Sequence, residues 1–94
     1  MNIIRGYALA PKVLVDSKQH ILFMYREQPD NLYDSGWRFF SGTESDEYVN
    51  DPQNIGLYDI LTIQRCDPEI IPYLDSPIGS VFSRTEAGLP FVKE

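Results

Sequence analysis

The sequence holds a single cysteine, Cys66, and a single histidine, His20. One cysteine cannot form an internal disulfide, and a zinc site needs a larger set of thiolate and imidazole ligands. The two residues would act as nucleophile and base only if the fold brought them together, and no catalytic motif surrounds either one. A free cysteine beside apolar residues usually serves in packing. The sequence therefore predicts no metal, no cofactor and no catalytic residue, and we expect a protein that is not an enzyme.

Long hydrophobic runs are also missing. The longest uninterrupted apolar run covers residues 21–25, whereas a transmembrane helix needs about 20 apolar residues. Residues 8–10 mimic a signal-peptide cleavage site, but Arg5 interrupts the apolar segment that should precede such a site. We therefore expect a cytoplasmic protein without a membrane partner.

Basic residues are scarce: eight lysines and arginines face fourteen acids, which gives a formal net charge of −6. This charge repels phosphate backbones, so we do not expect nucleic acid as a partner. No lysine or arginine lies between Arg38 and Arg65, and five acidic residues fall there: Glu44, Asp46, Glu47, Asp51 and Asp59. They lack the alternating spacing of a calcium loop. The stretch is either a solvated surface or a docking surface that attracts a basic protein partner.

The chain does contain enough apolar material for a core, with 43% hydrophobic and 13% aromatic residues. A chain of 94 residues is the size of one small domain, here residues 1–94. Seven prolines and six glycines spread along it indicate many short elements. The sequence predicts an α+β fold with one antiparallel sheet of four to six strands. Two or three short helices are expected between the middle and last strands.

The strands are predicted from period-two patterns. Residues 7–9 are typical of an opening strand, and residues 12–15 fit either a strand or a helical turn. Residues 20–27 indicate a strand buried on both faces. Residues 37–40 should pair with it in antiparallel fashion across a surface loop. A C-terminal hairpin is expected in residues 79–92.

The helices are predicted from their start and stop signals. Residues 43–50 begin with hydroxyls and acids that favour a helix N-terminus. The apolar spacing in residues 57–66 fits either a helix or a strand, and we predict a helix there, with Asp59 as its cap. Asp67, followed by proline and glutamate, predicts another helix start, and Pro72 keeps that helix short.

The stretch from Trp37 to Phe40 and the loop before it raise two further questions. Arg26 and Arg38 flank the predicted loop, and Asp30 and Asp34 lie within it, so local ion pairs are expected. Trp37 alternates in register with Phe39, which favours a place in the core over a binding hot spot on the surface.

Three stretches resemble the immunity-protein-33-like domain family: "FMYREQPDNLYDSGWRFFSGTESDEY", "DPQNIGLYDILTI" and "DPEIIPYLDSPIGSVF". The resemblance extends from Tyr7 to Arg84, and Leu61 stands where many relatives carry asparagine. It implies a bacterial protein that neutralises a partner toxin by binding it. The five acids would then form the docking surface for a basic toxin.

A second function remains open. Arg26 and Arg38, together with Asp34 and Asp75, would line a pocket for a small anion or metabolite, in a binding domain or in an enzyme, because arginine binds carboxylate and phosphate in bidentate fashion. If the chain instead neutralises a toxin, these four residues form structural ion pairs. A purely structural accessory domain is the third alternative.

Overall fold

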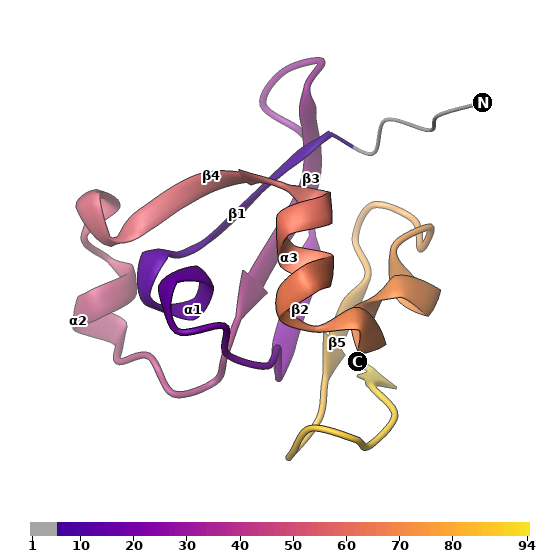
Figure 1. Ribbon diagram of the computed structural model, residues 1–94. Coiled ribbons are helices and arrows are strands. Elements are labelled where there is room, and N and C mark those ends of the chain that lie inside the picture. The colour runs from indigo at the N-terminus through magenta and orange to yellow at the C-terminus, as the bar shows by residue number, and fades with distance from the viewer. Residues whose placement is uncertain (1–5) are drawn as a thin grey trace.

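Six strands form one mixed sheet, in the order β4-β1-β3-β2-β5-β6 (Figure 1). The computed structural model describes residues 6–94, so residues 1–5 of the expected domain lie outside the described part. The strands are β1 (Tyr7–Pro11), β2 (Phe23–Arg26), β3 (Asp34–Phe40), β4 (Ile55–Asp59), β5 (Val81–Ser83) and β6 (Val92–Lys93). The α+β class and the number of strands are thus confirmed.

One pairing departs from the expected antiparallel sheet: β1 and β3 run parallel. The hairpin of β2 and β3 and the C-terminal hairpin of β5 and β6 are antiparallel, as predicted. The short helix α1 (Lys12–Asp16) follows β1, and the chain then enters β2. The chain reverses direction between β1 and β2 and again between β2 and β3, so β1 and β3 run in the same direction. Because β1 lies beside β3 and not beside β2, this pairing is parallel. Local sequence patterns do not encode which strands become neighbours, so this pairing was missed.

Two further α-helices and two 3₁₀ helices complete the described chain. They are α2 (Asp46–Val49), η1 (Pro52–Asn54), α3 (Ile60–Cys66) and η2 (Pro68–Tyr73). Asp59 and Asp67 begin α3 and η2 as predicted, because their carboxylates accept hydrogen bonds from the Leu61 and Glu69 amides. The prediction of a helix over residues 57–66 was wrong for residues 57–59, which belong to β4. Residues 12–15, which fitted either a strand or a helical turn, form part of the short helix α1.

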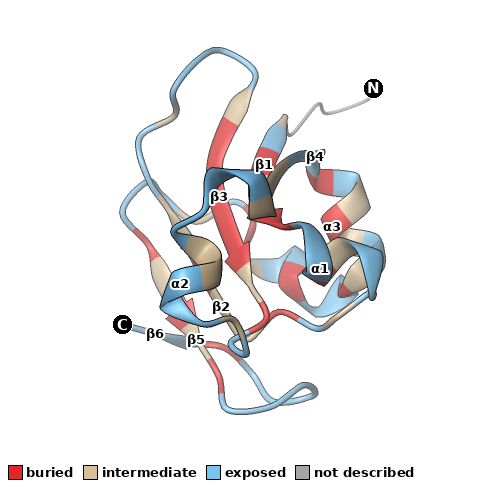
Figure 2. Cartoon of the chain, turned by 90° about the vertical axis from the view of Figure 1, so that its left-hand side faces the viewer, coloured by how far each residue is buried: buried red, intermediate tan, exposed pale blue. Residues whose placement is uncertain are grey.

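The core lies between the sheet and the layer of α1, α3 and η2. Trp37 and Phe39 point into it from β3, with their rings stacked at a centroid distance of 5.8 Å. Trp37 is only 1% exposed, and its indole Nε1 donates to the Leu74 carbonyl at 3.1 Å. Trp37 is therefore a core residue, as its alternation indicated. Figure 2 shows β3 largely buried, with α1 and α3 on one side of it and α2 on the other.

The strand predicted over residues 20–27 is shorter and less buried than expected. β2 covers only Phe23–Arg26, and of these residues only Met24 is buried. Phe23 and Tyr25 remain partly exposed because no long helix covers their face of the sheet. Among residues 6–94, moreover, no helix is long and apolar enough to cross a bilayer.

Replacing Trp37 by alanine should lower the free energy of unfolding by about 3–5 kcal/mol, because the mutation leaves a cavity and removes the hydrogen bond to Leu74. Urea unfolding monitored by circular dichroism measures this loss. Leu32→Ala, at a side chain that is 98% exposed, is the matched control and should change stability by less than about 0.5 kcal/mol. A loss below about 1 kcal/mol for Trp37→Ala would contradict its place in the core.

Candidate functional site

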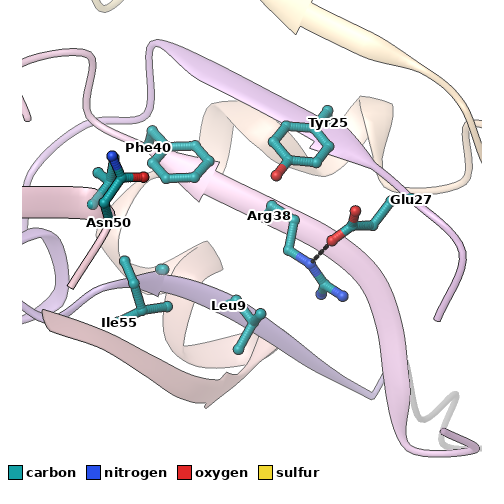
Figure 3. Close-up of a pocket in the computed structure, with 9 residues that line it drawn as sticks. Leu9, Tyr25, Glu27, Arg38, Phe40, Asn50 and Ile55 are labelled. Carbon is teal, nitrogen blue, oxygen red and sulfur yellow. Dashed lines mark hydrogen bonds and ion pairs between the residues drawn. The ribbon is translucent and has the colours of Figure 1, made fainter. Parts of the chain in front are cut away.

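The face of the sheet that points away from the core carries apolar and aromatic side chains with little cover. We call it the open face. It comprises Leu9, Phe23, Tyr25, Arg38, Phe40, Ile55 and Leu57, and Val49 of α2 borders it. Two adjoining hollows of about 290 and 330 Å³ lie on it and share Tyr25, Phe40 and Val49 as lining residues. Figure 3 shows the first hollow, with Tyr25 and Phe40 on one side and Leu9 and Ile55 on the other.

Strand register produces this face. Residues directly opposite each other in an antiparallel pair point to the same side of the sheet. Tyr25 lies opposite Arg38, and Phe23 lies opposite Phe40. Their neighbours Met24 and Phe39 point into the core. The rings of Phe23, Tyr25 and Phe40 form a cluster with centroid distances of 5.8–6.1 Å.

Arg38 is the charged centre of the open face, and it is only 3% exposed. Its guanidinium binds Asp34 in bidentate fashion, with Nη1 to Oδ1 at 2.9 Å and Nη2 to Oδ2 at 2.8 Å. Nε donates to Glu27 Oε2 at 2.6 Å (Figure 3), and Nη1 also donates to the Trp37 carbonyl. A buried cation is tolerated because these acceptors replace its water shell.

The ion pair changes the protonation of both partners. The hydrogen bonds from Arg38 hold the pKa of the Asp34 carboxyl far below its ordinary value. The same bonds, with that to Glu27, raise the pKa of Arg38 despite its burial. Burial also raises the pKa of the neighbouring Tyr25 hydroxyl. At neutral pH the open face therefore presents neutral aromatic rings and a compensated ion pair.

Arg26 lies on the opposite face of the sheet from Arg38. It is opposite Trp37 in the hairpin register, and its guanidinium carbon lies 5.8 Å from the indole centroid. Its Nε donates to the Ser35 carbonyl at 2.9 Å, and Nη1 donates to the Ser76 carbonyl at 2.8 Å. The two arginines therefore do not converge on a shared anion pocket. Arg26 joins the hairpin to the segment before β5, where Asp75 is an exposed neighbour of Ser76.

Three of the five acids between Arg38 and Arg65 hold local structure. Glu44 binds the backbone amides of Ser41 and Gly42 at 2.9 and 3.0 Å, so it organises its own loop. Asp51 caps η1, and Asp59 caps α3. Asp59 also lies at the far end of β4 from Ile55, about 13 Å away for a strand of this length.

The acids that do border the open face come from two parts of the chain. Glu27 lines the first hollow, and Glu44 and Asp46 line the second. We call these three residues the acidic rim. Glu47 is exposed and follows Asp46 in the first turn of α2. The sequence pattern does not connect Glu27 with the later acids, because only the fold brings the two segments to one face.

Cys66 and His20 lie in different surroundings. Cys66 lines a separate hollow with Val15, Lys18, Thr62 and Arg65. Burial raises the pKa of its thiol, which opposes formation of the nucleophilic thiolate. His20 Nδ1 lies 3.6 Å from Asp67 Oδ2 and is on the exposed surface.

A second buried ion pair occupies the one cluster of metal-type ligands found among residues 6–94. His20, Asp67 and Glu69 offer ligand atoms within 4.8 Å of one another. However, Arg84 Nη2 already binds Asp67 Oδ2 at 2.6 Å, and Nη1 binds Glu69 at 3.1 Å. Asp67 also accepts from the Ile21 amide. The guanidinium takes the place that a cation would need, so this cluster is structural.

Most of the open face was not identified from the sequence. Leu9, Tyr25, Phe40 and Ile55 are spread over four segments, and each is an ordinary strand or strand-end residue. One available signal was the alternation in residues 37–40, which places Arg38 and Phe40 opposite the core side chains. The helices are also too short to cover both sides of a six-stranded sheet.

Comparison with known proteins gives one match. Residues 8–93 match the family model described as "Immunity protein Imm33 domain". This match confirms the resemblance and covers nearly the whole chain. No curated protein and no solved structure shows significant similarity.

Replacing Asp34 by asparagine should destabilise the protein by about 3 kcal/mol at pH 7, because Arg38 would lose its buried counter-charge. The folded-state pKa of Asp34 lies below its unfolded value of about 3.9. The stabilisation is therefore complete above about pH 5 and is lost as the pH falls further.

Urea unfolding of the native protein and of Asp34→Asn, measured from pH 7 to pH 3, tests this expectation. The difference between the two proteins should shrink over the acidic half of that range. Asp30→Asn is the control, since Asp30 is exposed and lies 3.9 Å from Arg38. A difference that stays constant with pH would contradict the assigned ion pair.

Proposed function

This chain belongs to the Imm33 immunity protein domain family, and we propose that it neutralises a basic protein toxin by binding it on the open face. Immunity proteins protect the cell by direct binding, which demands complementary surfaces and no chemistry by the chain itself. We propose that the complex forms in the cytoplasm.

The single observation that carries the proposal is the partly exposed aromatic face of the sheet. A sheet normally buries each apolar face against another layer. Here Phe23, Tyr25 and Phe40 remain partly exposed. Leu57 on the edge strand is 62% exposed. Contiguous exposed apolar surface of this kind, rimmed by polar residues, marks sites of protein association.

Charge identifies the kind of partner. The acidic rim of Glu27, Glu44 and Asp46 borders both hollows, and the chain as a whole carries a net charge of −6. A positively charged surface would be attracted and oriented by this field, whereas an acidic surface would be repelled. A lysine or arginine of the partner would also find the faces of Tyr25 and Phe40 beside the rim, where cation–π contact is favourable.

The alternative of a small-anion site has no comparable support. Arg38 directs hydrogen bonds from Nε, Nη1 and Nη2 to Glu27, Asp34 and the Trp37 carbonyl. Arg26 directs two of its donors to backbone carbonyls on the other face. An anion at the open face would also meet Glu27, which lines the hollow. We therefore propose protein binding alone.

The toxin can be identified by capture on the tagged chain from extracts of its own cells, followed by mass spectrometry. To count as the toxin, the captured protein must arrest growth when it is expressed alone. Co-expression of this chain must restore growth. A captured protein that is harmless, or whose toxicity this chain does not relieve, would contradict neutralisation.

With that toxin in hand, the double reversal Asp46→Lys/Glu47→Lys should weaken binding about tenfold or more at low salt and flatten its salt dependence. These two acids are chosen because both are exposed, whereas Glu27 and Glu44 hold local structure. Isothermal titration calorimetry at two salt concentrations measures the effect.

The matched control is Glu86→Lys/Glu94→Lys, which makes the same change in net charge at exposed positions near the C-terminus. This control should lower affinity much less than the α2 reversal. Equal losses for the two double variants would show that net charge alone matters and would contradict an acidic rim at the interface.

A further inference from the structure

The connection between β2 and β3 exposes two large apolar side chains at its tip. Leu32 is 98% exposed and Tyr33 is 73% exposed, the two highest values among the exposed large hydrophobic residues of the described chain. We call residues 27–33 the finger loop. Figure 1 shows it projecting beyond the end of the sheet, away from the helices. Leaving such side chains in water costs hydrophobic free energy, so their position calls for a physical explanation.

Disorder does not explain this exposure, because internal hydrogen bonds hold the loop. Asn31 Oδ1 accepts from the amides of Tyr33 and Asp34 at 2.9 and 3.1 Å. Asp34 Oδ2 accepts from the Asp30 amide at 2.9 Å. The Tyr33 carbonyl accepts from the Tyr7 amide of β1 at 2.8 Å. Leu32 is therefore presented from a backbone that is fixed on both sides.

The base of the finger loop is built from the same ion pair that lies on the open face. Asp34, which binds the loop amide of Asp30, is the bidentate partner of Arg38. Glu27, the first loop residue, receives the Arg38 Nε hydrogen bond and lines the first hollow. Gly36 adopts a φ of +87°, and a side chain there would collide with the Glu27 carbonyl. Glu27 and the ion pair of Arg38 with Asp34 thus join the base of the finger loop to the open face.

We propose that the finger loop is a second docking element, which inserts Leu32 and Tyr33 into an apolar recess on the toxin that the open face binds. This inference rests on the proposed function. A convex apolar tip fits a concave site, and its fixed backbone reduces the entropy lost on binding. Because the side chain of Asp30 is 80% exposed and that of Glu27 is 51% exposed, the matching recess carries basic residues at its border.

A second copy of this chain is a poorer occupant. The hollows on its own open face have acidic borders, formed by Glu27, Glu44 and Asp46. The finger loop carries Asp30 beside its apolar tip. Like charges would therefore meet if the tip of one copy entered the hollow of another, and both copies carry a net charge of −6.

Site-specific photocrosslinking tests the inference with the toxin identified by capture and rescue, used as a purified protein. Benzoylphenylalanine is placed at position 32, at position 57 on the open face, or at position 89 in the C-terminal hairpin. Leu89 is 42% exposed and serves as the control. Positions 32 and 57 should both crosslink to the toxin, and position 89 should not.

Each other outcome has a definite meaning. Crosslinking at position 57 without position 32 would overturn the finger loop and leave the proposed function standing. Crosslinking at neither position would contradict both proposals. A product from position 32 with twice the mass of this chain would show that the finger loop contacts a second copy of the chain, which would overturn the toxin as its occupant. Crosslinking at position 32 alone would contradict a toxin that is bound by both the finger loop and the open face.

Affinity gives an independent measure. Leu32→Asp should weaken toxin binding roughly tenfold or more, as expected for a large apolar hot-spot side chain. Leu89→Asp makes the same chemical change on a distant turn and should leave the affinity within about twofold. Both variants should keep the melting temperature of the native chain, because both side chains are exposed. Unchanged affinity for folded Leu32→Asp would overturn the proposal.

Discussion

The period-two alternation of β3 is the constraint on which the rest of the structure depends. β3 lies inside the sheet, with β1 on one side and β2 on the other. Trp37 and Phe39 must therefore point to one face, and Arg38 and Phe40 to the other. The first pair needs a helical layer, and α1, α3 and η2 supply it. The second pair receives only the four-residue helix α2 beside it, so one strand generates both the core and the open face.

The same alternation gives the two arginines of the hairpin different tasks. Arg26 is on the core side, where it covers Trp37 and binds the Ser35 and Ser76 carbonyls. Arg38 is on the open side, where it is enclosed by Asp34 and Glu27. Arg26 thus links the first and the last of the three segments that carry the family resemblance. Arg38 shapes the surface that a partner would touch.

The sequence predicted what depends on neighbouring residues and missed what depends on distant ones. The β2–β3 hairpin, the caps at Asp59 and Asp67 and the burial of Trp37 all follow from local patterns. The parallel pairing of β1 with β3 and the edge strand β4 do not, because their partners are remote in the chain. The candidate site was found in part for the same reason. Asp46 could be identified within its acidic run, but Glu27 joins it only through the fold.

The parallel pairing of β1 with β3 also constrains how the chain folds. The β2–β3 hairpin closes a short connection, so it can form with little loss of loop entropy. β1 must instead find a partner far along the sequence, and the register Leu9 to Arg38 exists only once β3 is in place. We therefore expect the hairpin to form first and β1 to dock on it later. On this route Arg38 and Asp34 meet early, and the loop between β2 and β3 takes shape before the helices have covered Trp37.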